Sequence, residues 1–77
     1  MMNDSIFERL QLIAAEVFRC PPEQVTLQSS AENMTTWDSL THLNLVLALE
    51  QEFGRRFTPE QIDRMNCVST IVEILSA

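Results

Sequence analysis

Three consecutive residues, Asp38-Ser39-Leu40, stand where a long polar connection meets a predicted helix. A serine hydroxyl at a helix start is exposed, and the free backbone amides and the positive end of the helix dipole favour an anion there. A phosphate ester on Ser39 would therefore lie in a favourable field. Asp or Ser at this place is also an ordinary N-cap, which is the alternative interpretation of the same residues.

The same segment holds the residue types of a hydrolase triad, Asp38, Ser39 and His42. Ser39 and His42 could share a helix face because of their spacing. One short helix cannot arrange all three residues in the required order, and nothing supplies an oxyanion hole or a substrate pocket. We therefore do not expect hydrolysis, and we predict that His42 is a solvent-exposed helix residue or a partner contact.

The sequence does not indicate a metal site. Cys20, His42 and Cys67 are isolated residues without the spacing of metal ligands. The two cysteines form no disulfide framework, which predicts a reducing, cytoplasmic location. A single Cys20–Cys67 bridge stays an open alternative.

Composition restricts the other classes of function. The chain has 77 residues, 45% hydrophobic and 21% charged, which predicts one globular domain over residues 1–77. Its formal net charge is −6, which argues against nucleic acid and against an anionic membrane surface as partners. A basic protein surface is the expected electrostatic partner. The sequence shows no bilayer-spanning apolar run and no signal peptide.

The pattern of apolar residues predicts helices only, in an all-α four-helix bundle with three principal helices and one short helix. No segment alternates apolar and polar residues, which argues against a sheet. The first helix is predicted to begin at Ser5, in a capping box with Glu8, and to end before Pro21-Pro22.

Capping residues predict where the other three helices begin and end. The second is predicted over residues 38–53, with Gly54 ending it. The short third helix covers residues 59–65, with Thr58 as its N-cap and Gln61 as the return partner. A fourth helix follows Asn66 as its cap.

A long connection covers residues 20–37, with one helical turn predicted over residues 22–25. Val25, Leu27 and Met34 are predicted to pin this otherwise polar segment to the core. A connection this long in so small a domain is often functional. Its C-terminal end is therefore the place to look for chemistry.

The second helix carries two apolar stripes on opposite sides of its axis. One stripe consists of Leu45, Leu49 and Phe53. The other consists of Leu40, Leu43 and Leu47. One stripe must face the core, whereas the other is either an exposed partner surface or is buried by neighbouring helices. No Lys or Arg occurs between Arg19 and Arg55. The long connection and the second helix are therefore predicted to form an acidic half of the molecule without compensating basic residues, which suits basic partners.

At this point the sequence resembles a known family. Thr36-Trp37-Asp38-Ser39-Leu40, followed by the apolar helix of residues 43–53, is similar to an acyl carrier protein. Val25-Thr26 upstream, Thr58-Pro59-Glu60 at the third helix and Val68 at the fourth extend the resemblance over nearly the whole chain.

The resemblance implies that Ser39 carries 4′-phosphopantetheine through a phosphodiester, and that the arm holds acyl groups as thioesters. The protein would then be a monomeric carrier, not an enzyme, that shuttles acyl intermediates in a fatty-acid-like, polyketide or other specialised pathway. Asp38 and Leu40 would help a phosphopantetheinyl transferase to recognise the site. The implied contacts with a basic docking surface on an acyl ligase, transferase or synthase are Leu40, Leu43, Asn44, Leu47 and Glu50. By the same resemblance, the stripe of Leu45, Leu49 and Phe53 would line the side of the bundle where some members shelter an acyl chain.

Departures from the family's pattern favour a specialised, stand-alone carrier over a housekeeping one. Thr41 and Asn44 replace usual acidic residues, Trp37 replaces a small residue, and Arg55-Arg56 adds a basic pair. The Gly-Gly that peptidyl carriers have before the triplet is absent. The alternative is an unmodified helical interaction module of the same fold, with Ser39 only an N-cap.

Overall fold

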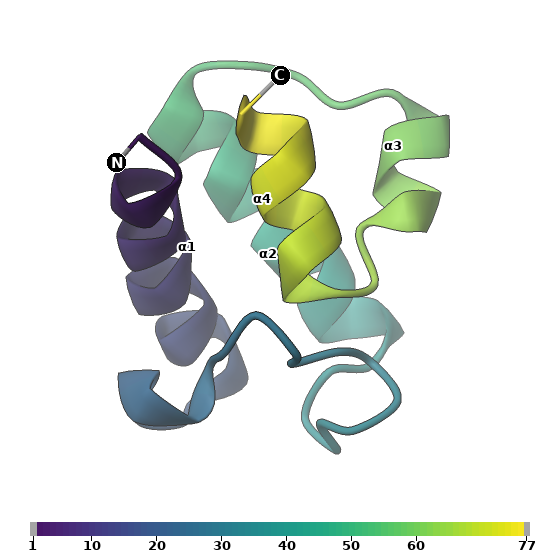
Figure 1. Cartoon of the computed structure of the whole chain (residues 1–77). Coiled ribbons are helices and arrows are strands. Elements are labelled where there is room, and N and C mark those ends of the chain that lie inside the picture. The colour runs from purple at the N-terminus through teal and green to yellow at the C-terminus, as the bar shows by residue number, and fades with distance from the viewer. Residues whose placement is uncertain (1, 77) are drawn as a thin grey trace.

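The computed structural model describes residues 2–76, with side chains from residue 5 onward, and contains four α-helices and no strand in that range. The helices are α1 (Met2–Phe18), α2 (Ser39–Phe53), α3 (Pro59–Arg64) and α4 (Val68–Ser76). A 3₁₀ turn, η1 (Pro22–Gln24), lies in the long connection between α1 and α2. The all-α prediction with three principal helices and one short helix is confirmed (Figure 1).

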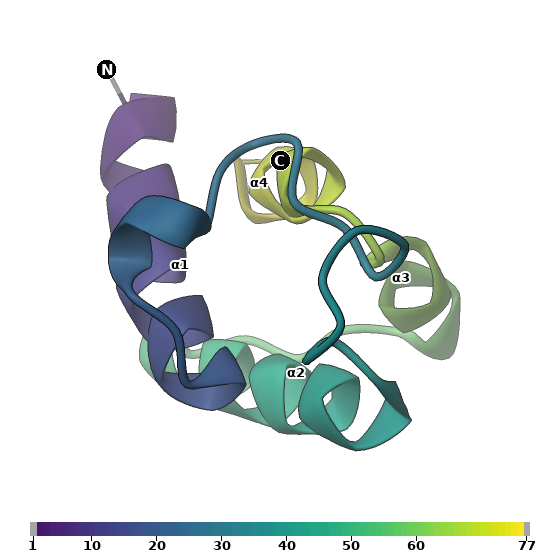
Figure 2. The ribbon, with the colours of Figure 1, turned by 90° about the horizontal axis from the view of Figure 1, so that it is seen from below.

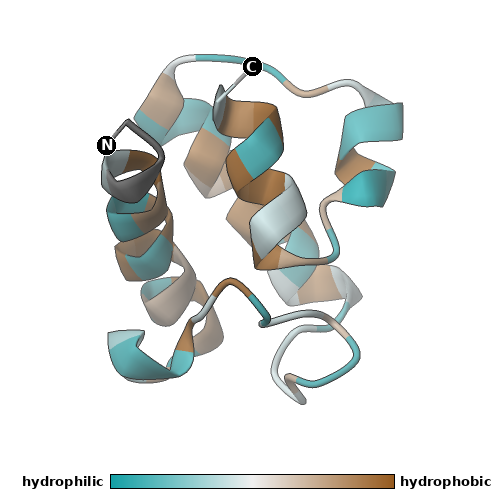
Figure 3. Cartoon of the chain, in the orientation of Figure 1, coloured by the Kyte–Doolittle hydropathy of each residue, from teal (hydrophilic) through white to brown (hydrophobic). Residues whose placement is uncertain are grey.

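The helices surround one hydrophobic core. α1 packs against both α2 and α4, and α3 packs against α4. Figure 2 shows the four helices around a common centre, which side chains fill. Figure 3 shows hydrophobic residues along most of α4 and mainly hydrophilic residues on α3. The most deeply buried side chains are Phe18, Leu10, Leu45, Leu49, Met65, Ile71, Val25, Val46 and Val68.

α1 differs from its prediction at the start and ends in a left-handed residue. The helix already contains Ser5, so the predicted capping box of Ser5 with Glu8 is wrong. Arg19 has a φ of 56°, and the N–H of Cys20 donates to the carbonyl of Ala15 at 3.0 Å. This is a Schellman ending, in which the left-handed residue turns the next N–H back toward the helix.

The predicted ends of α2 and the predicted start of α3 are confirmed. Asp38 is the N-cap of α2, and Gly54 ends it with a φ of 60°. Glycine adopts this left-handed conformation without a steric penalty. Thr58 and Gln61 form the predicted capping box of α3, which ends one residue earlier than expected, at Arg64.

The long connection, not Asn66, caps the first turn of α4. The N–H of Val68 donates to the carbonyl of Ser29 at 2.9 Å, and that of Ser69 donates to the carbonyl of Leu27 at 3.2 Å. These bonds satisfy amides that have no partner within the helix. The prediction of Asn66 as the cap is wrong, because α4 begins two residues later.

The long connection is also tied to α1 and to the core. The side-chain amide of Gln11 donates to the carbonyls of Pro22 and Val25 at 2.8 and 2.9 Å. Val25 is buried and Met34 packs against the core, as predicted. Leu27 is exposed, so its predicted anchoring role is wrong, and its carbonyl instead serves α4. The connection therefore reaches Ser39 as an ordered segment.

Candidate functional site

Ser39 is the first residue of α2, and its side chain is exposed. Within the described part of the chain, no group hydrogen-bonds the Ser39 hydroxyl. The backbone is nevertheless fixed there, because Asp38 just before it is an extended N-cap with φ −109° and ψ −172°. The hydroxyl thus combines a defined position with free access from solvent.

Asp38 and Thr41 bond each other across the first turn of α2. The N–H of Thr41 donates to Asp38 Oδ1 at 2.9 Å, and the N–H of Asp38 donates to Thr41 Oγ1 at 2.9 Å. The Thr41 hydroxyl donates in turn to the carbonyl of Thr36 at 2.7 Å. The hydrogen bond from the Thr41 amide lowers the pKa of Asp38 below its ordinary value. The capping amide is therefore used by Asp38, while the helix dipole still favours negative charge at this end.

His42 lies one turn beyond Ser39, but its ring is committed elsewhere. Trp37 Nε1 donates to His42 Nδ1 at 3.1 Å, and His42 Nε2 lies 3.0 Å from the carbonyl oxygen of Ile62. The prediction that His42 is a solvent-exposed helix residue is wrong, because it is partly buried. With both ring nitrogens bonded away from Ser39, the residues of the hydrolase triad do not assemble.

An open hollow adjoins Ser39. Its volume is about 510 Å³. It is lined by Ala31, Trp37, Asp38, Ser39, His42, Asp63 and Asn66. The long connection, the start of α2 and the α3 region thus all contribute to the surroundings of the hydroxyl.

The leucine stripe (Leu40, Leu43 and Leu47) is exposed along α2. Its side chains are 68%, 52% and 54% exposed, respectively. On the opposite side of the helix, Leu45 and Leu49 are almost completely buried. The structure therefore decides between the two interpretations of the pattern in favour of an exposed apolar surface.

Asn44 is exposed beside the leucine stripe, but Glu50 is only partly available. Glu50 Oε2 accepts the N–H of Phe57 at 3.0 Å, so this carboxylate holds the loop between α2 and α3. Arg55 packs over the Phe57 ring and donates to the carbonyl of Ile74 at 3.2 Å. The predicted partner contact at Glu50 therefore also has a structural role.

The prediction that the acidic half of the molecule has no compensating basic residue is wrong. Arg9 of α1 reaches Glu52 of α2, with 3.4 Å between the guanidinium and the carboxylate. The Arg9 guanidinium also lies 4.3 Å from the centroid of the Phe53 ring. The spacing of charges along the chain did not reveal this pairing, because Arg9 reaches Glu52 only through the packing of α1 against α2.

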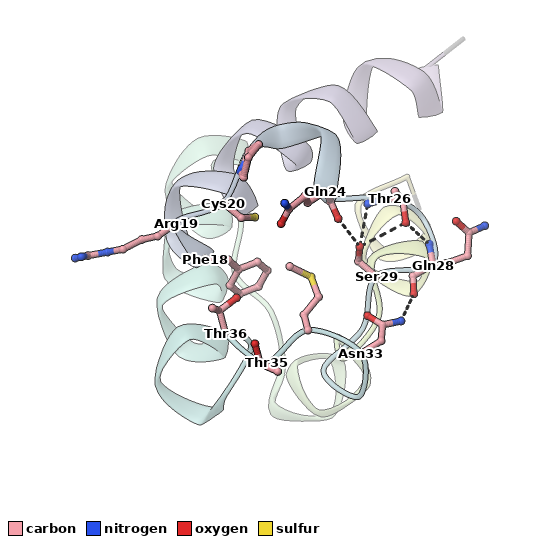
Figure 4. A pocket seen from close by; sticks show the side chains of 12 residues that line it. Phe18, Arg19, Cys20, Gln24, Thr26, Gln28, Ser29, Asn33, Thr35 and Thr36 are labelled. Atoms are coloured by element: carbon pink, nitrogen blue, oxygen red, sulfur yellow. Dashed lines mark hydrogen bonds between the residues drawn. The ribbon is translucent and has the colours of Figure 1, made fainter.

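Another pocket lies away from Ser39, at the end of α1 and along the connection (Figure 4). Its volume is about 670 Å³, and its lining includes neither Ser39 nor a residue of the leucine stripe. Ser29 in its wall accepts the N–H of Thr26 at 2.9 Å, and Asn33 donates to the carbonyl of Gln28 at 2.9 Å. These polar groups satisfy one another, so we assign the pocket to the folding of the connection.

Cys20 and Cys67 are free thiols, so the alternative of a Cys20–Cys67 bridge is not realised. The hydrogen bond with the Ser69 side chain lowers the pKa of the Cys67 thiol. Over the described residues, no group of three or more metal-ligating side chains is found. No helix in residues 2–76 has the length and apolar character needed to cross a bilayer.

Comparisons with known proteins agree on one family. The family model described as "Phosphopantetheine attachment site" matches residues 8–75. The chain is 31% identical over 77 residues to the acyl carrier protein of Coprothermobacter proteolyticus, covering 100% of this chain and 94% of that protein. It is 34% identical over 74 residues to that of Saccharopolyspora erythraea, covering 96% and 78%.

A solved structure is similar as well. The solution structure of the holo acyl carrier protein from Geobacter metallireducens superimposes with a TM-score of 0.81 at 26% sequence identity. The match covers 91% of this chain and 80% of that one. Fold and sequence therefore point to the same relatives.

Proposed function

Since this chain belongs to the acyl carrier protein family, whose members use 4′-phosphopantetheine as the prosthetic group, we propose that Ser39 is the residue that carries the group. When bound, the group supplies a terminal thiol that holds an acyl chain as a thioester. The protein itself acts as a carrier and is not a catalyst. The described residues include no second exposed serine at the start of a helix and next to an apolar docking surface.

The observation that carries the proposal is the state of the Ser39 hydroxyl. It is exposed and has no hydrogen-bond partner in the described part of the chain. A hydroxyl is the group that a phosphodiester linkage requires, and an exposed one is open to a modifying enzyme. The Asp38–Thr41 capping box fixes the backbone on both sides of it without using it. The residues present therefore fit the attachment of the group.

The leucine stripe supplies the surface for partner enzymes in this proposal. It begins at Leu40, next to Ser39, and continues along α2 with Asn44 exposed beside it. Glu50 ends the surface and contributes its charge while holding Phe57. The net charge of −6 favours partners with basic docking surfaces, because opposite charges steer association. These partners are a phosphopantetheinyl transferase and an acyl ligase, transferase or synthase.

We further propose a specialised biosynthetic pathway, such as a fatty-acid-like or polyketide pathway, as the setting. Exposed Asn44 and partly buried Thr41 stand where housekeeping carriers have acidic residues, so the docking face relies more on apolar contact. The proposal places the protein in the cytoplasm as a monomer, with residues 1–77 as one carrier domain.

Intact mass spectrometry tests the attachment. The purified protein is incubated with coenzyme A, magnesium and a broad-specificity phosphopantetheinyl transferase. The expected result is a gain of one phosphopantetheinyl group in the wild type and none in Ser39→Ala. Ser5→Ala, which removes another exposed serine hydroxyl on α1, is the matched control and should be modified fully. An unmodified wild type, or modification of Ser39→Ala, would overturn the assignment of Ser39.

A further inference from the structure

The ring of His42 connects three separate parts of the fold. Through Nδ1 it accepts from the Trp37 indole at 3.1 Å, and through Nε2 it meets the carbonyl of Ile62 at 3.0 Å. Trp37 ends the long connection, His42 is in the first turns of α2, and Ile62 is in α3. Within residues 2–76, this is the one hydrogen bond that joins α2 directly to α3.

The partners of His42 define the protonation state of its ring. An indole nitrogen only donates, so Nδ1 must accept and carries no proton. A backbone carbonyl only accepts, so Nε2 must carry the proton and donate. The neutral Nε2–H tautomer satisfies both bonds at once. A second proton on Nδ1 would set two N–H groups against each other and break the bond to Trp37.

Trp37 connects the hydrogen bond of His42 to the hydrophobic core. Its side chain is buried and its ring centroid lies 4.9 Å from that of Phe18, at the end of α1. It is also nearly parallel to the imidazole, at an interplanar angle of 24°. Because Trp37 precedes Asp38 directly, a shift of the indole would displace the cap of α2 and the backbone of Ser39.

We propose that His42, as the neutral Nε2–H tautomer, is a positioning residue for Ser39. It fixes the first turn of α2 against both the long connection and α3, and thereby presents the Ser39 hydroxyl to the enzyme that attaches the prosthetic group. This inference rests on the proposed function of Ser39.

The chain offers clean probes for this link, because it contains one tryptophan and one histidine. Nuclear magnetic resonance can identify the tautomer of the His42 ring from its two nitrogen signals, and can show whether the Trp37 indole N–H is hydrogen-bonded. In the wild type we expect the Nε2–H tautomer and a hydrogen-bonded indole N–H. In His42→Asn, whose Oδ1 replaces the Nδ1 acceptor, the indole N–H should stay bonded, whereas in His42→Leu it should lose its bond.

A second measurement tests whether the link positions Ser39. The value of kcat/KM for modification of Ser39 by the transferase should fall about tenfold in His42→Leu, as expected for losing a specific hydrogen-bonded link. His42→Asn should recover most of that loss. Trp37→Phe retains an aromatic ring on Phe18 but has no donor, and should lose activity like His42→Leu. This variant keeps the test intact if His42→Leu does not fold.

The outcomes separate the two proposals. An indole signal that is the same in His42→Leu as in the wild type, or equal kcat/KM values in folded His42→Leu, Trp37→Phe and wild-type proteins, would overturn the positioning role. A wild type that the transferase does not modify would overturn the assignment of Ser39. In that case the indole N–H signal alone would still show whether the link exists.

Discussion

Asp38 and Thr41 close the start of α2 with two reciprocal hydrogen bonds, each 2.9 Å long. Ser39 lies between them, and among the described residues its hydroxyl has no hydrogen-bond partner. The same two residues therefore stabilise the helix and leave the hydroxyl free. The bonds that stabilise the helix start and the hydroxyl proposed for modification therefore use different atoms.

The lowered pKa of Asp38 predicts a specific dependence of stability on pH. The Thr41 amide stabilises the charged carboxylate in the folded state, so the folded pKa lies below the unfolded one. Asp38 therefore contributes stability above its unfolded pKa of about 3.9, and this contribution is lost as the pH falls through the folded pKa. In Asp38→Asn the titration is absent, whereas the amide oxygen can still cap the helix.

The measurement is the difference in Tm between wild type and Asp38→Asn over that acid range. We expect the wild type to lose more stability than the variant as the pH falls. Thr41→Val removes the hydroxyl that accepts the N–H of Asp38 but keeps the amide that makes the largest contribution to the pKa shift, so it should retain most of the acid dependence. Parallel curves for wild type and Asp38→Asn would contradict the prediction.

The two faces of α2 predict opposite results for similar substitutions. Leu49 is fully buried, and Leu49→Ala should lower the free energy of unfolding by about 3 kcal/mol through lost burial and a cavity. Leu43 on the leucine stripe is half exposed, so Leu43→Ala should change it by less than about 0.5 kcal/mol. Urea denaturation followed by circular dichroism measures both. Equal losses would place the leucine stripe in the core.

The left-handed backbone of Arg19 predicts a stabilising substitution. A residue with a Cβ pays a steric cost at its φ of 56°, and glycine avoids this cost. Arg19→Gly should therefore stabilise the protein by about 1 kcal/mol and raise Tm by about 4–8 °C. Arg19→Ala removes the guanidinium without relieving the backbone and should give no such gain. If Arg19→Ala stabilised the protein equally, charge would be the cause instead of conformation.

Local signals in the sequence were sufficient for most helix ends. Asp38, Gly54 and Thr58 each act through neighbours within one helical turn, so their roles were predictable without tertiary structure. The cap of α4 was not, because its partners Ser29 and Leu27 come from a distant loop. These partners are backbone carbonyls, which every residue type has, so the identities of residues 27 and 29 do not reveal the cap. A residue such as Asn66 can then suggest a cap that the fold does not use.

The candidate site divides in the same way. The exposed Ser39 and the two stripes of α2 follow from position and helical period, and were predicted. The bonds of His42 were missed because they join Trp37, five residues earlier, and the carbonyl of Ile62, 20 residues later. From the sequence, Trp37 was recognisable only as a large residue where a small one usually precedes Asp38-Ser39-Leu40. Its burial against Phe18 supplies the physical reason for its size.

A charge on the leucine stripe should weaken docking without unfolding the protein. Leu47 is 54% exposed, so Leu47→Glu should leave Tm nearly unchanged. It replaces apolar contact with a carboxylate that an apolar partner surface must desolvate. We therefore expect kcat/KM for modification of Ser39 to fall about tenfold, mainly through KM. The control is Leu12→Glu on α1, where the leucine is 62% exposed and the added charge is the same.

This pair separates a local contact from the effect of net charge. Both variants make the chain more acidic by one unit, so a long-range electrostatic effect on the transferase would act on both alike. Only Leu47 lies on the helix that presents Ser39, so only Leu47→Glu should raise KM. Equal kinetics in the two variants would remove the leucine stripe from the docking surface. A collapsed circular dichroism spectrum in Leu47→Glu would instead place Leu47 in the core, against its observed exposure.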